Sequence, residues 1–125
     1  MTWQRWLAVF IGSAVGTGLR VAVSLLNAGP GGWPWGTFAV NLTGAFLLGY
    51  LLARLQGRRP PRTRLLAFLG TGLLGSYTTF SAFAEESRAL LADAEVVLAL
   101  AYVLTSLVLG VALAWAGIRA ARLRP

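Results

Sequence analysis

The chain has 125 residues, of which 57% are hydrophobic and only 12% are charged. Soluble domains carry about 25% charged residues, so this composition excludes an ordinary soluble protein. Cys and His are both absent, which excludes disulfides, thiolate chemistry and the usual transition-metal ligand and general base.

The net charge of +7 comes from eleven basic residues, all of them Arg. A strongly basic chain can indicate nucleic-acid binding. Here the arginines flank apolar segments, which is how a membrane protein faces anionic lipid and sets its orientation. We therefore expect a membrane partner and no nucleic acid.

Four apolar segments divide the chain, at about residues 6–26, 36–55, 65–91 and 94–118. Each approaches or exceeds the roughly 20 residues with which a helix crosses a hydrocarbon core. The sequence therefore predicts an all-α membrane protein with one four-helix domain and no linker. The first segment could instead be a secretory signal peptide, but Arg20 interrupts it and no A-x-A-like cleavage site follows.

Arg20 lies well inside the first segment, where a cation is costly unless it faces protein or water. It could snorkel to the nearby interface, add positive potential to an anion path, or tie helix ends at a subunit contact. Gly12 and Gly16 in the same segment form a GxxxG pair, which predicts close helix packing.

The second segment carries Thr37 and Asn41 on one helical face. The two N–H donors of the Asn41 amide must find partners in an apolar setting. They could bond to a neighbouring helix, or they could contribute to a polar path together with other donors.

The third segment contains GTGLLGSYTTFSAF at residues 70–83. Its small and hydroxyl residues include Gly75, Ser76, Thr78, Thr79 and Ser81. Glycine tolerates unusual backbone shapes, and non-helical backbone at membrane depth survives only beside protein or a water-filled cavity. We expect a break near mid-membrane whose freed carbonyls bind an ion. The alternative is an unbroken helix that uses its small residues for packing.

Phe80 and Phe83 are three residues apart and share a helical face. They could face lipid. Alternatively, the positive edges of their rings could favour an anion without offering it a proton.

In the fourth segment Tyr102 and Ser106 are one turn apart and predict a stripe of hydroxyl donors. No carboxylate lies at the middle of any segment, and Glu85 and Glu86 are at the far end of the third. Proton-coupled exporters usually need such a carboxylate. The chain also has no phosphate-binding loop, no nucleophile with a base and no metal cluster, so we expect no enzyme.

The arginines also predict the orientation. With four spans, the two termini and the second connector share a side that holds nine arginines, against Arg88 alone opposite. This bias predicts cytoplasmic termini.

Three motifs resemble the Fluc (CrcB) family of bacterial fluoride channels: GTGLR at residues 16–20, GTFAVNLTGAFLLG at 36–49 and GSYTTFSAFAEE at 75–86. The resemblance covers nearly the whole chain, and the third motif is the most specific. It implies a fluoride-specific channel of the bacterial inner membrane that lets fluoride leave the cytoplasm passively and so confers fluoride resistance. The membrane potential would supply about 2.3 kcal/mol per charge per 100 mV.

The resemblance also implies an antiparallel dimer with two pores and a structural sodium ion on the dimer axis. The sodium would be held by backbone carbonyls of Gly75 and Thr78. The residues expected along the fluoride pore are Asn41, Thr79, Phe80, Ser81, Phe83, Tyr102 and Ser106. Those expected in supporting positions are Arg20, Thr37 and Glu86.

Two features depart from the family pattern. Ser76, Tyr77 and Ala84 replace the usual residues around TTFS, and the Tyr77 hydroxyl has no partner that the sequence identifies. The arginine asymmetry also predicts a single orientation, whereas many members form homodimers by inserting in both. We therefore expect a partner that is either a second copy or, favoured by the asymmetry, an oppositely oriented paralogue.

Two other functions stay open at this point. A small four-span multidrug exporter would also work as an antiparallel dimer, but it needs an intramembrane carboxylate. A partner subunit without a conducting pore of its own would support fluoride flux only through the residues of another chain.

Overall fold

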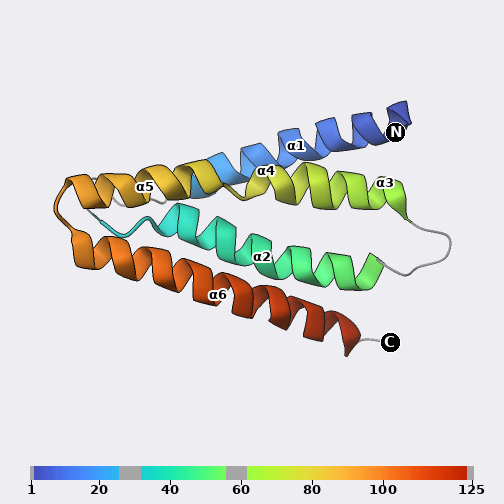
Figure 1. Ribbon diagram of the computed structural model, residues 1–125. Helices are drawn as coiled ribbons and strands as arrows, with labels where there is room; N and C mark the ends of the chain where they lie inside the picture. Colours follow the sequence, from blue (N-terminus) through green and yellow to red (C-terminus); the bar gives the residue numbers. More distant parts are fainter. Residues whose placement is uncertain (1, 26–31, 56–61, 124–125) are drawn as a thin grey trace.

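The computed structural model describes residues 2–25, 32–55 and 62–123. These residues are helical or in short connections, with no strand among them. Four of the helical stretches are long and apolar enough to cross a membrane. The predicted all-α, four-span fold is therefore confirmed, and Figure 1 shows the spans lying side by side.

The first two spans are single helices, α1 (Trp3–Ser24) and α2 (Trp35–Leu55). The fourth span is also a single helix, α6 (Val96–Arg122). The third is composite, and in chain order it consists of α3 (Thr63–Leu66), the π-helix η1 (Ala67–Leu74), α4 (Gly75–Tyr77) and α5 (Phe80–Ala92).

The third span is broken at two residues. Thr78 has φ −79° and ψ 158°, and Thr79 has φ −147° and ψ 123°, so both are extended. The Thr78 N–H still makes the last i to i−4 hydrogen bond, to the Leu74 carbonyl oxygen, but the extended backbone does not carry the helical ladder beyond it. The predicted break in the third helix is confirmed, and it falls between Tyr77 and Phe80.

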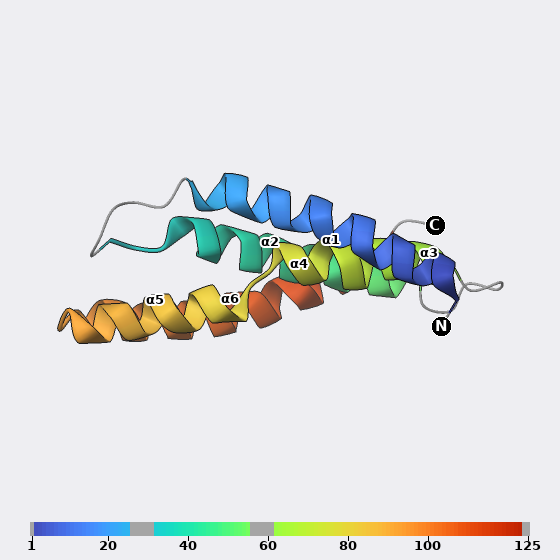
Figure 2. The same ribbon diagram turned by 90° about the horizontal axis from the view of Figure 1, so that it is seen from above.

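The break changes which helix the third span packs against. The half before it, η1 and α4, packs along α1, whereas α5 packs against α6. Figure 2 shows the extended connection carrying the chain from one neighbour to the other. α2 packs along α6 and also contacts both halves of the third span. It is therefore placed to support the break from the side.

Glycines permit the closest helix contacts. A Cβ on Gly12 would meet the Phe68 carbonyl oxygen, and one on Gly16 would meet the Leu73 carbonyl oxygen. The close packing predicted from this GxxxG pair is confirmed, and its partner is η1. A second glycine contact joins α2 and α6, where Gly117 lies against the Phe46 carbonyl oxygen.

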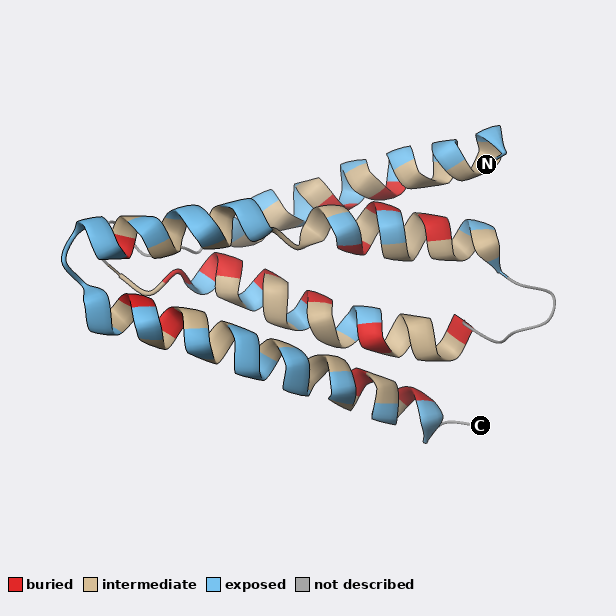
Figure 3. Cartoon of the chain, in the orientation of Figure 1, coloured by how far each residue is buried: buried red, intermediate tan, exposed pale blue. Residues whose placement is uncertain are grey.

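Among the described residues, burial falls mainly along the lines of contact between helices. Figure 3 shows buried residues along the inner faces and exposed residues over the outer ones. Large apolar side chains such as Phe10 and Val97 are exposed. In water such a surface would be unfavourable, but lipid tails are as apolar as these side chains.

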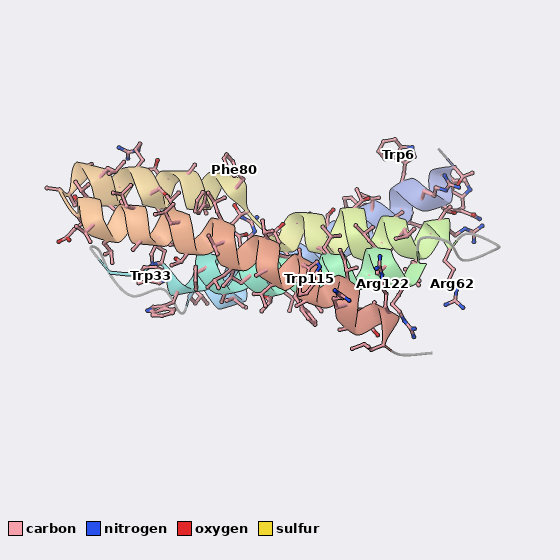
Figure 4. All side chains as sticks on the ribbon, turned by 60° about the horizontal axis from the view of Figure 1, so that its bottom comes forward. Trp6, Trp33, Arg62, Phe80, Trp115 and Arg122 are labelled. Atoms are coloured by element: carbon pink, nitrogen blue, oxygen red, sulfur yellow. The ribbon has the colours of Figure 1, made fainter. Side chains whose placement is uncertain are left out.

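Charge is divided between the two ends of the bundle. The start of α1 and the end of α6 lie at the same end (Figure 1), and Figure 4 shows Trp6, Arg62 and Arg122 there. The four carboxylates of the chain follow the break and lie in α5 or in the turn before α6. Arg58, Arg59 and Arg124, which are among the nine arginines expected on the cytoplasmic side, lie outside the described residues.

Candidate functional site

The backbone of the break is held by one side chain of α2. The Asn41 Nδ2 donates to the Thr79 carbonyl oxygen at 2.9 Å, and the Thr79 N–H donates to the Asn41 Oδ1 at 2.8 Å. The primary amide therefore pairs with the Thr79 backbone as a second peptide group would, replacing bonds that the helix cannot make there. One N–H of the amide is not used in this pairing.

Hydroxyl groups satisfy further backbone atoms on both sides of the break. The Thr78 hydroxyl and N–H both donate to the Leu74 carbonyl oxygen, at 3.0 and 3.1 Å. The Thr79 Oγ1 caps α5 by accepting from the Ala82 N–H at 3.2 Å, and it lies 3.2 Å from the Ser81 hydroxyl. Thr79 is thus an N-cap residue, and Ser81 belongs to the start of α5.

Carbonyls become available just before the break. The last C=O groups of a helical segment have no intrahelical partner, because the residues that would donate to them lie outside the helix. Gly75 would pair with the Thr79 N–H in a continuous helix, but that N–H donates to Asn41 instead. Carbonyl oxygens of this kind are hard donors that suit an alkali or alkaline-earth cation.

A cavity of about 410 Å³ lies beside the break. Its walls are mostly apolar. Its polar wall residues are Asn41, Thr78, Thr79 and Ser106, and both Gly75 and the phenylalanine pair also line it. The Ser106 Oγ is buried and has no hydrogen-bond partner within the described part of the chain. A small polar guest in this cavity would therefore meet one unsatisfied hydroxyl and an amide.

Phe80 and Phe83 form the aromatic part of the cavity wall. Their ring centroids lie 6.0 Å apart at an interplanar angle of 45°. Phe83 also packs on the Tyr102 ring at 5.3 Å, whereas Phe80 is 79% exposed. Figure 4 shows Phe80 projecting from the bundle next to the break. The two rings are therefore adjacent, but only Phe83 is supported by its own chain.

A second polar cluster is built around Glu86. The Thr37 hydroxyl donates to one carboxylate oxygen at 2.6 Å, and the Tyr102 hydroxyl donates to the other at 2.8 Å. Trp33 lies edge-on to the Tyr102 ring at 5.5 Å. Three helices thus converge on a single carboxylate, so Glu86 is held firmly by two short hydrogen bonds.

The structure separates some residues that the sequence placed together. Tyr102 is fully buried and faces Glu86, whereas Ser106 lines the cavity at the break, so they belong to two different polar groups. Arg20 belongs to neither group. It is half-buried on α1, and its Nε has no hydrogen-bond partner among the described residues.

Two contacts at the break involve residues that sequence reasoning did not pair. The Tyr77 and Thr43 hydroxyls lie 3.0 Å apart, which gives Tyr77 its partner. Gly44 lies against the Thr78 methyl group. The one sequence signal was a phenol in an apolar span, which requires a hydrogen-bond partner but does not say where it lies.

Comparison with known proteins points to one family. The family model described as CrcB-like protein, Camphor Resistance (CrcB), matches residues 7–118. Fluoride-specific ion channel FluC 2 of Moorella thermoacetica is 50% identical over 91% of this chain and 93% of its own length. Proteins named fluoride-specific ion channel FluC from Thermus thermophilus and Oceanobacillus iheyensis are 43% and 40% identical. The matches cover 93% and 92% of this chain, and 94% and 89% of those proteins.

Proposed function

This chain belongs to the CrcB family, and on that premise we propose that it is a fluoride-specific ion channel that lets fluoride cross the membrane passively. It is a multi-pass membrane protein and an ion channel, not an enzyme. The observation that carries the proposal is the cavity at the helix break, where Asn41, Ser106 and two phenylalanines line one space.

The chemical task of such a channel is to remove water from a small, tightly hydrated anion and still release it. The second N–H of Asn41, which the Thr79 pairing does not use, and the Ser106 hydroxyl, which has no partner among the described residues, are donors that replace part of the hydration shell. The edges of Phe80 and Phe83 add weak positive potential. A site made of neutral donors and ring edges holds an anion less tightly than a fixed cation does, which permits conduction.

The Glu86 cluster has a different role in this proposal. Fluoride and a carboxylate repel each other, so Glu86 cannot hold the ion directly. Because Thr37 and Tyr102 both donate to Glu86, their hydroxyl hydrogens are directed to the carboxylate. We place the three residues at one end of the path, where they order the helices that line it.

A structural sodium ion is a further part of the proposal. The carbonyls of Gly75 and Thr78 lie at the break and beside the cavity, and Gly75 is exposed on the surface of the single chain. Carbonyl oxygens are suitable ligands for sodium. Two carbonyls make half of a cation site, and a second copy would supply the other half. Bound there, the ion would hold the two breaks together by neutralising converging carbonyl dipoles.

The partner in this arrangement is an antiparallel one. The exposure of Phe80 and Gly75 at the break supports a partner that covers them. An antiparallel neighbour would also bring the acidic end of one chain beside the arginine-rich end of the other. We propose a second copy or, given the arginine asymmetry, an oppositely oriented paralogue. The same asymmetry supports cytoplasmic termini, and we propose a bacterial inner membrane as the location.

Fluoride efflux from proteoliposomes tests this function. Liposomes that contain the chain are loaded with fluoride, and a potassium ionophore sets the membrane potential. We expect rapid efflux with the unmodified chain and a large loss with Phe80→Ile or Phe83→Ile, which keep an apolar side chain and remove the ring. Leu104→Ile, at an exposed position on α6 away from the cavity wall, serves as the matched control. Unchanged flux in both phenylalanine variants would remove the aromatic part of the mechanism.

A further inference from the structure

The break is supported by one turn of α2 through three neighbouring contacts. Asn41 pairs with the Thr79 backbone, and Gly44 receives the Thr78 methyl group. Between these two contacts in the sequence, the Thr43 Oγ1 lies 3.0 Å from the Tyr77 hydroxyl. Each residue from Tyr77 to Thr79 therefore has its own neighbour on α2.

The direction of the Tyr77 hydrogen bond follows from the other bonds of Thr43. A threonine hydroxyl has one hydrogen to donate and two lone pairs to accept with. The Thr43 Oγ1 lies 2.7 Å from the Ala39 carbonyl oxygen, which can only accept. The threonine hydrogen is therefore used within α2, and the Tyr77 O–H donates to Thr43. This bond links the last residue of α4 to α2.

Tyr77 is the last helical residue before the extended pair. Two extended residues have four free dihedral angles, so the relative position of α4 and α5 depends on contacts from the side. Without such contacts, rotation about these angles would let α4 and α5 shift against each other. Asn41 fixes the far side of the break, and the Tyr77 hydroxyl fixes the near side.

We propose that Tyr77 is a positioning residue of the pore, whose hydroxyl bond to Thr43 locks the near side of the break and thereby places Thr79 and Phe80 at the cavity. Tyr77 itself does not line the cavity at the break, whereas Thr79 and Phe80 do. The hydroxyl therefore acts through the backbone rather than on the ion. The proposal rests on the proposed channel function, and its test separates the two.

The first arm of the test is a double-mutant cycle on fluoride efflux. Tyr77→Phe removes the donor and Thr43→Val removes the acceptor, and both keep the shape of the side chain. Each variant should slow efflux about threefold, which corresponds to the roughly 0.6 kcal/mol of an average side-chain hydrogen bond in a membrane. The double variant should also be about threefold slower, because both changes remove the same bond.

Two further variants control this cycle. Thr43→Ser keeps the hydroxyl and should retain the unmodified rate. Tyr50→Phe removes a phenol hydroxyl elsewhere on α2 and should leave efflux unchanged. Independent effects that multiply to about ninefold, or unchanged efflux in both Tyr77→Phe and Thr43→Val, would overturn the proposal.

The second arm measures the break without any ion flux. The chain has no cysteine, so Thr71→Cys and Ala84→Cys place two spin labels at exposed positions before and after the break. Labelled chains diluted with unlabelled ones should give one narrow distance distribution, and Tyr77→Phe should broaden it or add a second distance. An unchanged distribution overturns the proposal. Absent efflux, both from the unmodified chain alone and from the chain together with an oppositely oriented paralogue, would defeat the channel function, while the distances would still decide the role of Tyr77.

Discussion

Gly44 should be one of the least replaceable residues near the break. A Cβ at this position would lie far inside the contact distance of the Thr78 methyl carbon. The next atoms, Tyr77 Cδ1 and Thr78 Cβ, lie at 3.6 and 3.7 Å, which is ordinary contact. The clash in Gly44→Ala is therefore with one methyl group on one side chain.

The cost of Gly44→Ala follows from this geometry. Adding a methylene-sized group to packed surroundings costs about 1–3 kcal/mol. The Thr78 methyl cannot simply rotate away, because its hydroxyl is bonded to the Leu74 carbonyl oxygen. We expect Gly44→Ala to lower the thermal midpoint in detergent and to reduce fluoride efflux, since the strain falls on an extended residue of the break.

Thr78→Ser should rescue Gly44→Ala. Serine removes the clashing methyl and keeps the hydroxyl that donates to Leu74. Gly18→Ala is the matched control, because its Cβ would meet no atom within 4 Å, and alanine is up to about 1 kcal/mol more favourable than glycine in a helix. The reasoning is refuted if Gly44→Ala is as stable and as active as the unmodified chain, or if Thr78→Ser restores neither property.

Three further changes have defined outcomes. Asn41→Leu leaves the Thr79 N–H and C=O unpaired, at a cost of about 1–3 kcal/mol each. Fluoride efflux should therefore be abolished, and the Thr79 amide should exchange its hydrogen faster. Slow exchange in the variant would contradict the role of the pairing. Glu86→Gln keeps a polar group for both hydroxyls and should retain most of the thermal stability in detergent. Glu86→Leu should lower the thermal midpoint by several degrees. Equal midpoints in the two variants would contradict the hydrogen-bonded cluster. Gly117→Ala should push α6 away from the Phe46 carbonyl and lower the thermal midpoint, while Gly110→Ala adds a Cβ in open space and should not.

The fold was predictable from the sequence because each of its determinants is local. Four apolar segments separated by polar or proline-rich connectors can satisfy their backbone groups in lipid only as helices. The concentration of glycine and hydroxyl residues between Gly70 and Phe83 predicted the break in the third helix. The exact place, Thr78 and Thr79, was not predictable, since it depends on Asn41, which lies 38 residues earlier.

The sequence predicted a set of candidate residues, but it did not predict how they are arranged in the fold. Tyr102 and Ser106 are one turn apart, so they were expected in one stripe. In the structure Tyr102 instead bonds to a carboxylate on another helix. Likewise, the partner of Tyr77 depends on how α2 is rotated and shifted against α4. Such rotations are set by packing contacts between helices, including the glycine contacts, which helical periodicity alone does not specify.

The most direct test of the channel at the helix break is anion efflux from liposomes that contain this chain alone. Under a potential set by a potassium ionophore, fluoride should leave within seconds to minutes of ionophore addition, while chloride should stay inside over the same period. Fluoride retention equal to that of protein-free liposomes, both for this chain alone and for this chain together with an oppositely oriented paralogue, or equal efflux of fluoride and chloride, would contradict the account.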